Sequence, residues 1–137
     1  LPTTAEWEYA AAASPTRPDG ANDPEFIRQV RAWYATPAPA TLPAVGKGRA
    51  NIFGVHDLHG LIWEWVADWY DPTYYQFSVR DNPKGPSAGP LRALRGGAWN
   101  NDSKAIRSSN RAGYAPDARR NDVGFRCAQD GPSPERR

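Results

Sequence analysis

The sequence has little of several residue types and patterns that would assign a function directly. Its 137 residues include one cysteine, two histidines and no methionine. One cysteine excludes a disulfide within the chain and a metal cluster held by several thiolates. No run of about 18 apolar residues occurs, so the sequence predicts no membrane span. The net charge is only +2, and the basic residues are scattered, which argues against a nucleic-acid partner.

Aromatic residues, in contrast, are plentiful. They make up 12% of the chain, and six of them are tryptophan. Tryptophan and tyrosine combine a large apolar surface with a polar group, so they favour cores and binding surfaces. A chain of this length suits one domain with one core.

The first half of the chain contains one clear helix signal, at residues 1–13 (LPTTAEWEYAAAA). Thr3 or Thr4 can cap this helix, and with Thr3 as the cap Glu6 completes a capping box. Residues 14–26 contain Pro, Gly and Asn and are predicted to form a loop. Residues 27–46 predict a short apolar segment followed by Pro-spaced extended chain.

The second half predicts short strands separated by irregular chain. Residues 48–70 are expected to form turn, loop and a short strand, and residues 91–99 (LRALRGGAW) a strand with a glycine pair. Residues 105–128 predict a strand or short helix, a loop around Pro116–Asp117 and a final strand. Scarce helix and abundant irregular chain indicate a loop-rich α+β domain built on a small sheet.

One segment concentrates the polar and aromatic chemistry: HDLHGLIWEWVADWY, residues 56–70. It holds both histidines, three tryptophans and three acidic residues. A metal site, a catalytic pocket and a buried structural motif are all open hypotheses. The spacing of His56 and His59, with Glu64 nearby, suggests a zinc site, but a third firm ligand is missing. Isolated histidines are usually surface or hydrogen-bonded core residues.

Five blocks in order resemble the sulfatase-modifying-factor family, also called formylglycine-generating-enzyme-like domains. They are LPTTAEWEYAAAA, GVHDLHGLIWEWVADWY, NPKGPSAG, LRGGAWN and NDVGFRCA. The resemblance implies a variant C-type lectin-like fold with small antiparallel sheets and few helices. It covers residues 1–130 as the C-terminal portion of such a domain, since the family's N-terminal strands have no counterpart. Residues 131–137 are expected to be a disordered tail.

The resemblance implies a structural calcium ion in the tryptophan-rich block. Carried over by position, the ligands would be the carboxylates of Asp57 and Glu64 and the carbonyls of Gly60 and Ile62. Calcium takes six to eight hard oxygen ligands, which a tight glycine-containing loop can supply. The alternative is that Asp57 caps a turn and Glu64 pairs with a nearby arginine. Pairs of this kind, in the interior or at its rim, are expected between three arginines and carboxylates such as Glu64, Asp68 or Asp117. The arginines are Arg107, Arg111 and Arg126.

The founding activity of the family, oxidation of a sulfatase cysteine to formylglycine, is not expected here. The resemblance implies a copper site on two thiolates, placed after the Gly-Gly-Ser-Trp strand, because soft thiolates select Cu(I). This chain has no cysteine between Gly96 and Arg126, and Cys127 lies at a framework position. We therefore expect no copper and no formylglycine generation. An oxidase or accessory maturation enzyme acting on a protein or peptide side chain remains the alternative.

Residues 96–126 also resemble the variable region of proteins diversified by retroelements. A fixed frame (RGGAW, RSSNR, PD, GFR) is interleaved with positions that can all arise from an Asn codon by replacing only adenines. Lys, Trp, Glu, Gln and Met cannot arise in this way, and none occurs between Ala105 and Arg126. Lys104 breaks the pattern if it is also variable.

These residues predict a binding surface on a rigid scaffold, the arrangement that adaptable loop surfaces use. The expected function is binding of a protein or small-molecule ligand by a catalytically empty domain, and a purely structural domain is a third hypothesis. The predicted ligand-binding residues are Trp99, Asn100, Asn101, Asp102, Asn110, Ala112, Gly113, Tyr114, Ala118, Arg119, Arg120, Asn121 and Asp122.

Overall fold

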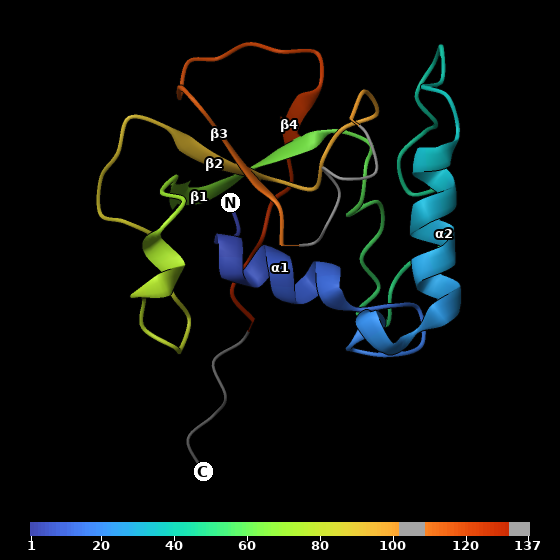
Figure 1. The fold of residues 1–137 in the computed structure, drawn as a ribbon, viewed down its shortest axis with the longest axis horizontal. Helices are drawn as coiled ribbons and strands as arrows, with labels where there is room; N and C mark the ends of the chain where they lie inside the picture. Colours follow the sequence, from blue (N-terminus) through green and yellow to red (C-terminus); the bar gives the residue numbers. More distant parts are fainter. Residues whose placement is uncertain (102–108, 132–137) are drawn as a thin grey trace.

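A small mixed sheet forms the centre of the computed structural model, which describes residues 1–101 and 109–131. The strands are β1 (Trp63–Trp69), β2 (Arg92–Arg95), β3 (Arg111–Tyr114) and β4 (Val123–Phe125). Their order is β3-β2-β1-β4 (Figure 1). Strand β2 is antiparallel to both β1 and β3, whereas β4 is parallel to β1. The strands lie where the sequence predicts them.

Helix α1 (Thr4–Ala12) begins at the predicted capping box. The Thr3 hydroxyl accepts a hydrogen bond from the Glu6 amide at 3.2 Å, and the Glu6 carboxylate accepts one from the Thr3 amide at 2.7 Å. Two amides at the helix start are thereby satisfied by adjacent side chains. The cap is a local interaction, which is why the sequence identifies it.

The alternation of side chains along β1 divides the core into two parts. Trp63 packs with Leu94 and Ala98, and Trp65 lies against the same cluster. Val66, on the other face of the strand, packs with Trp7 of α1 in the second cluster. Because strand side chains alternate between faces, β1 has a tryptophan face and a face that carries α1.

The glycine pair after β2 has a steric function. Gly96 has φ of +102° and Gly97 has φ of +72°, conformations that other residues rarely adopt. A Cβ on Gly96 would lie 3.2 Å from both the Leu58 carbonyl oxygen and a carbon of the Trp7 indole. A glycine pair in a strand indicates a close backbone approach or a bulge, and the structure shows the close approach.

Helix α2 (Pro24–Ala35) corrects the sequence-based prediction. Residues up to 26 were expected to be loop and the following residues a short apolar segment. Instead, Asp23 caps the helix by accepting the Phe26 amide at 3.1 Å, and Pro24 occupies the first turn. Proline lacks an amide hydrogen and has a helical φ, so at this position it starts a helix rather than breaking one.

Helix α2 stands apart from the sheet (Figure 1). None of its residues is fully buried. A short 3-10 helix, Gly20–Asn22, precedes it, and a second one, Tyr74–Gln76, follows β1. Over residues 1–101 and 109–131, no helix combines the length and the hydropathy needed to cross a bilayer.

Candidate functional site

The acidic residue at the centre of the tryptophan-rich block, Glu64, is paired with an arginine from the end of the chain. Arg126 donates from Nε to one carboxylate oxygen at 2.7 Å and from Nη2 to the other at 2.6 Å. Trp7 Nε1 donates to the same carboxylate at 2.7 Å. Glu64 is buried, so these charge-assisted hydrogen bonds form away from water, where they are strong. We call Trp7, Glu64 and Arg126 the Glu64 cluster.

The Glu64 cluster also fixes the loop that precedes β1. Arg126 donates to the carbonyl oxygens of His56 and Asp57 at 3.0 and 3.2 Å. The Asp57 carboxylate accepts the Gly46 amide at 2.5 Å, and Asp57 itself has φ of +57°. One arginine therefore joins β1, the segment after β4 and this loop, while Asp57 stabilises a turn.

This arrangement does not fit Glu64 as a calcium ligand. Both carboxylate oxygens accept hydrogen bonds from the Arg126 guanidinium, whose positive charge would repel a divalent cation. A calcium ion bound by Asp57, Gly60, Ile62 and Glu64 would have to displace Arg126. A calcium ion and the Arg126 guanidinium would thus compete for the Glu64 carboxylate. Calcium binding stays a prediction.

The two histidines each contact a backbone carbonyl. His59 Nε2 lies 3.0 Å from the Ala11 carbonyl oxygen and His56 Nδ1 lies 2.7 Å from that of Gly48. Burial lowers the pKa of the His59 imidazole, opposed by the Ala11 carbonyl and by Glu64. No group of three His, Cys, Asp or Glu side chains suited to a metal occurs in the described part of the chain.

The predicted ligand-binding residues lie on edge strand β3, on the loop after β2 and on the loop between β3 and β4. We call residues 99–101 and 110–122 the loop face. Asp102 falls outside the described residues. Asn101 closes the turn after the glycine pair: its side chain accepts the Ala98 amide at 2.7 Å. Trp99 is half-buried against the core cluster of Trp63, Leu94 and Ala98, called the tryptophan cluster.

The four predicted residues around β3 are mostly constrained by packing. Ala112 and Tyr114 lie against the tryptophan cluster. A Cβ on Gly113 would lie 2.6 Å from two carbons of the Tyr70 ring, so no larger residue fits without movement. The carbonyl of Asn110 accepts a hydrogen bond from the buried Arg95 at 2.9 Å.

The loop before β4 is organised by a buried carboxylate. Asp122 accepts Arg120 Nε at 2.8 Å and Asn100 Nδ2 at 3.1 Å. The hydrogen bond from Arg120 is the main cause that lowers the pKa of Asp122, and the bond from Asn100 lowers it further. Arg120 also lies 4.8 Å from the centre of the Tyr114 ring. Asp122 therefore supports the loop face from below, and its neighbours present their side chains to solvent.

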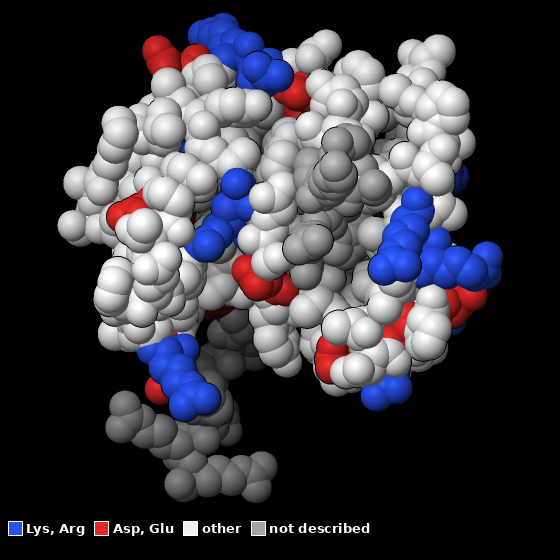
Figure 2. Space-filling model, in the orientation of Figure 1, with Lys and Arg blue, Asp and Glu red and all other residues white. Residues whose placement is uncertain are grey.

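Among the predicted ligand-binding residues, the exposed ones have polar side chains. Asn100, Arg119, Arg120 and Asn121 are exposed, and Ala118 is half-buried. In the view of Figure 2, Lys and Arg side chains are spread among Asp and Glu. Asp117, Arg119 and Arg120 are all exposed, so the loop face is a mixed polar surface.

A cavity of about 310 Å³ borders the loop face at Trp99 and Asn101. Its other wall comes from α2 and the Pro-spaced segment after it, including Trp33, Tyr34 and Pro37. Sequence reasoning missed these residues because the helix itself was not predicted. Their signal was the apolar spacing along residues 26–34, which fits one face of a helix.

Comparisons with known proteins identify relatives of the whole fold. Residues 1–131 match the family described as the sulfatase-modifying factor enzyme 1-like domain. The chain is 35% identical over 150 residues to the formylglycine-generating enzyme of Streptomyces coelicolor, covering 95% of this chain and 46% of that protein. It is 36% identical over 135 residues to the serine/threonine-protein kinase pkn1 of Chlamydia pneumoniae, covering 95% of this chain and 21% of the kinase.

A solved structure gives the same result for the fold. Treponema denticola variable protein 1 superposes with a TM-score of 0.73 at 31% identity, over 91% of this chain and 45% of that one. The chain thus spans less than half the length of each of these three proteins. The small sheet, few helices and long loops agree with the α+β, C-type-lectin-like fold that the sequence predicts. With residues 1–131 matched, the chain belongs to the sulfatase-modifying factor family, whose members include the formylglycine-generating enzymes.

Proposed function

We propose that this domain binds a protein or small-molecule ligand through the loop face and performs no formylglycine chemistry of its own. The observation that carries this proposal is the cavity of about 310 Å³ lined by Trp99 and Asn101. It lies at the segment after the Gly-Gly-Ala-Trp sequence, where the family resemblance implies copper-binding thiolates. Asparagines occupy that segment in this chain, and an amide is a hydrogen-bonding group, not a ligand for Cu(I).

The division of side chains within the loop face supports binding. Asp122 and Gly113 are fixed from below, while Asn100, Arg119 and Asn121 are exposed. A rigid support beneath exposed Asn and Arg side chains is the arrangement of adaptable binding surfaces, in which aromatic and Arg residues act as anchors. The expected anchors are Trp99 at the cavity, Tyr114, and the exposed Arg119 and Arg120.

Diversification by a retroelement is a further part of this proposal. The codon argument for residues 100–122 motivates it, and a relative named as a variable protein has the same fold. Deep sequencing of the corresponding codons from a clonal culture tests it. We expect substitutions at adenines of these codons and none at Gly96, Gly97 and Gly124. Evenly spread or absent variation would reject diversification and leave a fixed binding surface.

Binding itself is tested by site-specific photocrosslinking in the native cell. A photoreactive amino acid at Asn121 is expected to capture a partner covalently. The control is the same group at Gln76, an exposed residue of the 3-10 helix after β1. Equal capture at both positions, or capture at Gln76 alone, would show that the loop face is not the binding surface.

The alternative function, an oxidase or accessory maturation enzyme, rests on relatives that are formylglycine-generating enzymes. It is tested by supplying Cu(I) and a cysteine-containing peptide and measuring oxygen uptake and peptide mass. We expect no uptake and no mass change, because one cysteine cannot provide two thiolates. Stoichiometric copper binding with oxidation of the peptide would favour the enzyme.

A further inference from the structure

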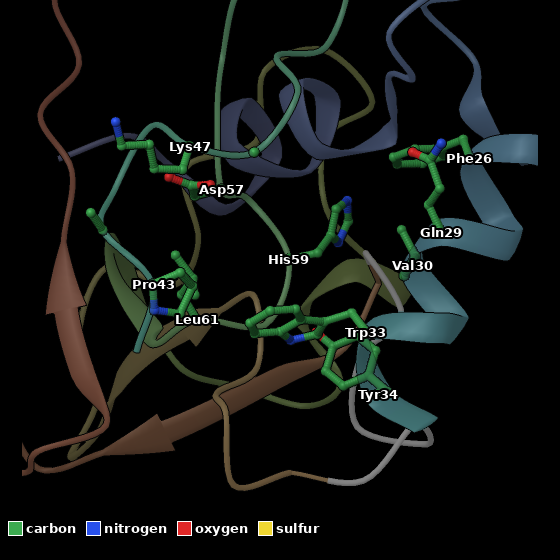
Figure 3. Close-up of a pocket in the computed structure, with 12 residues that line it drawn as sticks. Phe26, Gln29, Val30, Trp33, Tyr34, Pro43, Lys47, Asp57, His59 and Leu61 are labelled. Carbon is green, nitrogen blue, oxygen red and sulfur yellow. The ribbon is translucent and has the colours of Figure 1, made fainter. Parts of the chain in front are cut away.

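A second cavity lies beside α2 and shares Trp33, Tyr34 and Pro43 with the cavity at the loop face. Its volume is about 380 Å³, within the range of about 300 to 1,000 Å³ typical of small-molecule sites. Figure 3 shows α2 on one side and the segments around Pro43 and His59 on the other. The walls of this cavity include Phe26, Val30, Trp33, Tyr34, His59 and Leu61.

The apolar face of α2 lines this cavity and is not packed into a core. Phe26, Val30, Trp33 and Tyr34 follow the spacing i, i+4, i+7 and i+8, which places them on one side of a helix. All four are half-buried and none is fully buried. An amphipathic helix normally buries this face against other elements. Here it borders a hollow large enough for a ligand.

The imidazole of His59, in the cavity wall, has a nitrogen that is available as an acceptor. His59 Nε2 faces the Ala11 carbonyl, which can only accept a hydrogen bond, so this nitrogen carries the hydrogen. In a neutral imidazole the other nitrogen, Nδ1, then has a free lone pair. The Tyr34 hydroxyl does not serve this purpose, because it is buried against Gly60.

The remaining polar groups favour a neutral ligand. Lys47 and Asp57 lie at one end of the cavity (Figure 3), and their opposite charges cancel. The rest of the wall is largely aromatic and aliphatic. A polypeptide segment would bring one amide and one carbonyl per residue, each needing a partner when buried, and these walls offer few. A small, flat and mostly apolar molecule matches the walls better.

We propose that this cavity binds a neutral aromatic molecule with one hydrogen-bond donor, such as a hydroxyl group. The ring lies between Trp33 and Leu61, and the donor group hydrogen-bonds to His59 Nδ1. This site is separate from the loop face, and its existence does not depend on the function proposed for that surface.

The experiment is calorimetric titration of the full chain with 2-naphthol and with 2-methoxynaphthalene, which has no donor. We expect 2-naphthol to bind and the methoxy compound to bind about 2- to 10-fold more weakly, since a hydrogen bond contributes about that much. No binding of either compound at millimolar concentration would overturn the proposal, as would equal affinity for both.

Two matched variants locate the site. Val30 lines this cavity and not the one at Trp99, so Val30→Trp is expected to fill it and weaken 2-naphthol binding at least tenfold. Val79→Trp changes an exposed valine elsewhere and is expected to leave the affinity unchanged. Thermal melting confirms that each variant is folded, and the two-ligand comparison stands if Val30→Trp is not.

A third variant separates this site from the loop face. Trp99→Ala is expected to leave 2-naphthol binding intact, because Trp99 lines the other cavity. If Trp99→Ala abolishes binding and Val30→Trp does not, the probe occupies the loop-face cavity, and the proposal for the α2 cavity is overturned. Failure of photocrosslinking at Asn121, in contrast, would reject only the loop-face function.

Discussion

The Glu64 cluster and the loop face use the same kinds of residue in opposite ways. In the Glu64 cluster, the buried carboxylate accepts three hydrogen bonds from Arg126 and Trp7. On the loop face, the guanidinium of Arg120 pairs with a buried carboxylate while its side chain is 44% exposed. The first arrangement closes the fold, and the second leaves polar groups available to a partner. Residue type alone therefore does not separate structural from binding roles, whereas burial does.

The largest loss in the free energy of unfolding is expected from removing Arg126 from the Glu64 cluster. Arg126→Ala leaves the carboxylate of Glu64, which is only 8% exposed, without its counter-charge. Removing one partner of a buried pair costs about 3 to 5 kcal/mol, and we expect a loss of about 3 kcal/mol in the free energy of unfolding. Chemical denaturation measures it. The control, Arg28→Ala, removes a surface pair with Glu25 and should cost less than about 1 kcal/mol.

The next largest loss of stability is expected at Gly113, a loop-face residue that packs against a ring. Gly113→Asn places a side chain against the Tyr70 ring, and overpacking of this kind costs about 1 to 3 kcal/mol. In the double variant with Tyr70→Ala, the two costs are expected not to add, because the clash is removed. Additive costs would mean that Gly113 is not limited by Tyr70.

A calcium ion would compete with Arg126 for the Glu64 carboxylate, so added calcium tests which of the two neutralises it. Thermal melting with EDTA and with added calcium measures whether the predicted ion stabilises the chain. A bound ion raises the melting temperature with its concentration, and Glu64→Ala should abolish that rise. An unchanged melting temperature, in both the parent chain and Glu64→Ala, would remove the calcium prediction and leave the Glu64–Arg126 pair as the sole arrangement.

Protonation of His59, which borders the α2 cavity and lies near Glu64, is expected to have a smaller effect on stability. Burial lowers its pKa in the folded chain, so the unfolded chain binds a proton more readily, below about pH 6.5. Because the unfolded state then carries more protons, stability falls as pH decreases through that value. The melting temperature should drop between pH 7.5 and 5.5, and His59→Gln should flatten this drop. An equal drop in both proteins would assign the pH dependence to another group.

The smallest effect is expected at the exposed positions of the loop face. Arg119→Ala and Asn121→Ser should each change the free energy of unfolding by less than about 0.5 kcal/mol, as surface substitutions usually do. Both residues are exposed. A loss larger than about 1 kcal/mol at either position would place it with Gly113 as a packing residue and shrink the proposed binding surface.

Local signals in the sequence account for much of the framework. The capping box at Thr3 and Glu6, the glycine pair after β2 and the positions of the strands along the chain all follow from residues close together in the sequence. The start of α2 was equally local, at Asp23 and Pro24. It was misinterpreted because Pro and Asp also mark loops, and only the hydrogen bond to Phe26 distinguishes the two cases.

The sequence by itself determined the family, through five ordered motifs, and the lack of a cysteine pair, which is a matter of counting. Only the tertiary structure decided which residue pairs with Glu64, because Arg126 is 62 positions away. The same holds for the packing of Gly113 on Tyr70 and for the hollow beside α2. Propensities and caps act over a few residues, whereas burial and ion pairing depend on which distant segments meet.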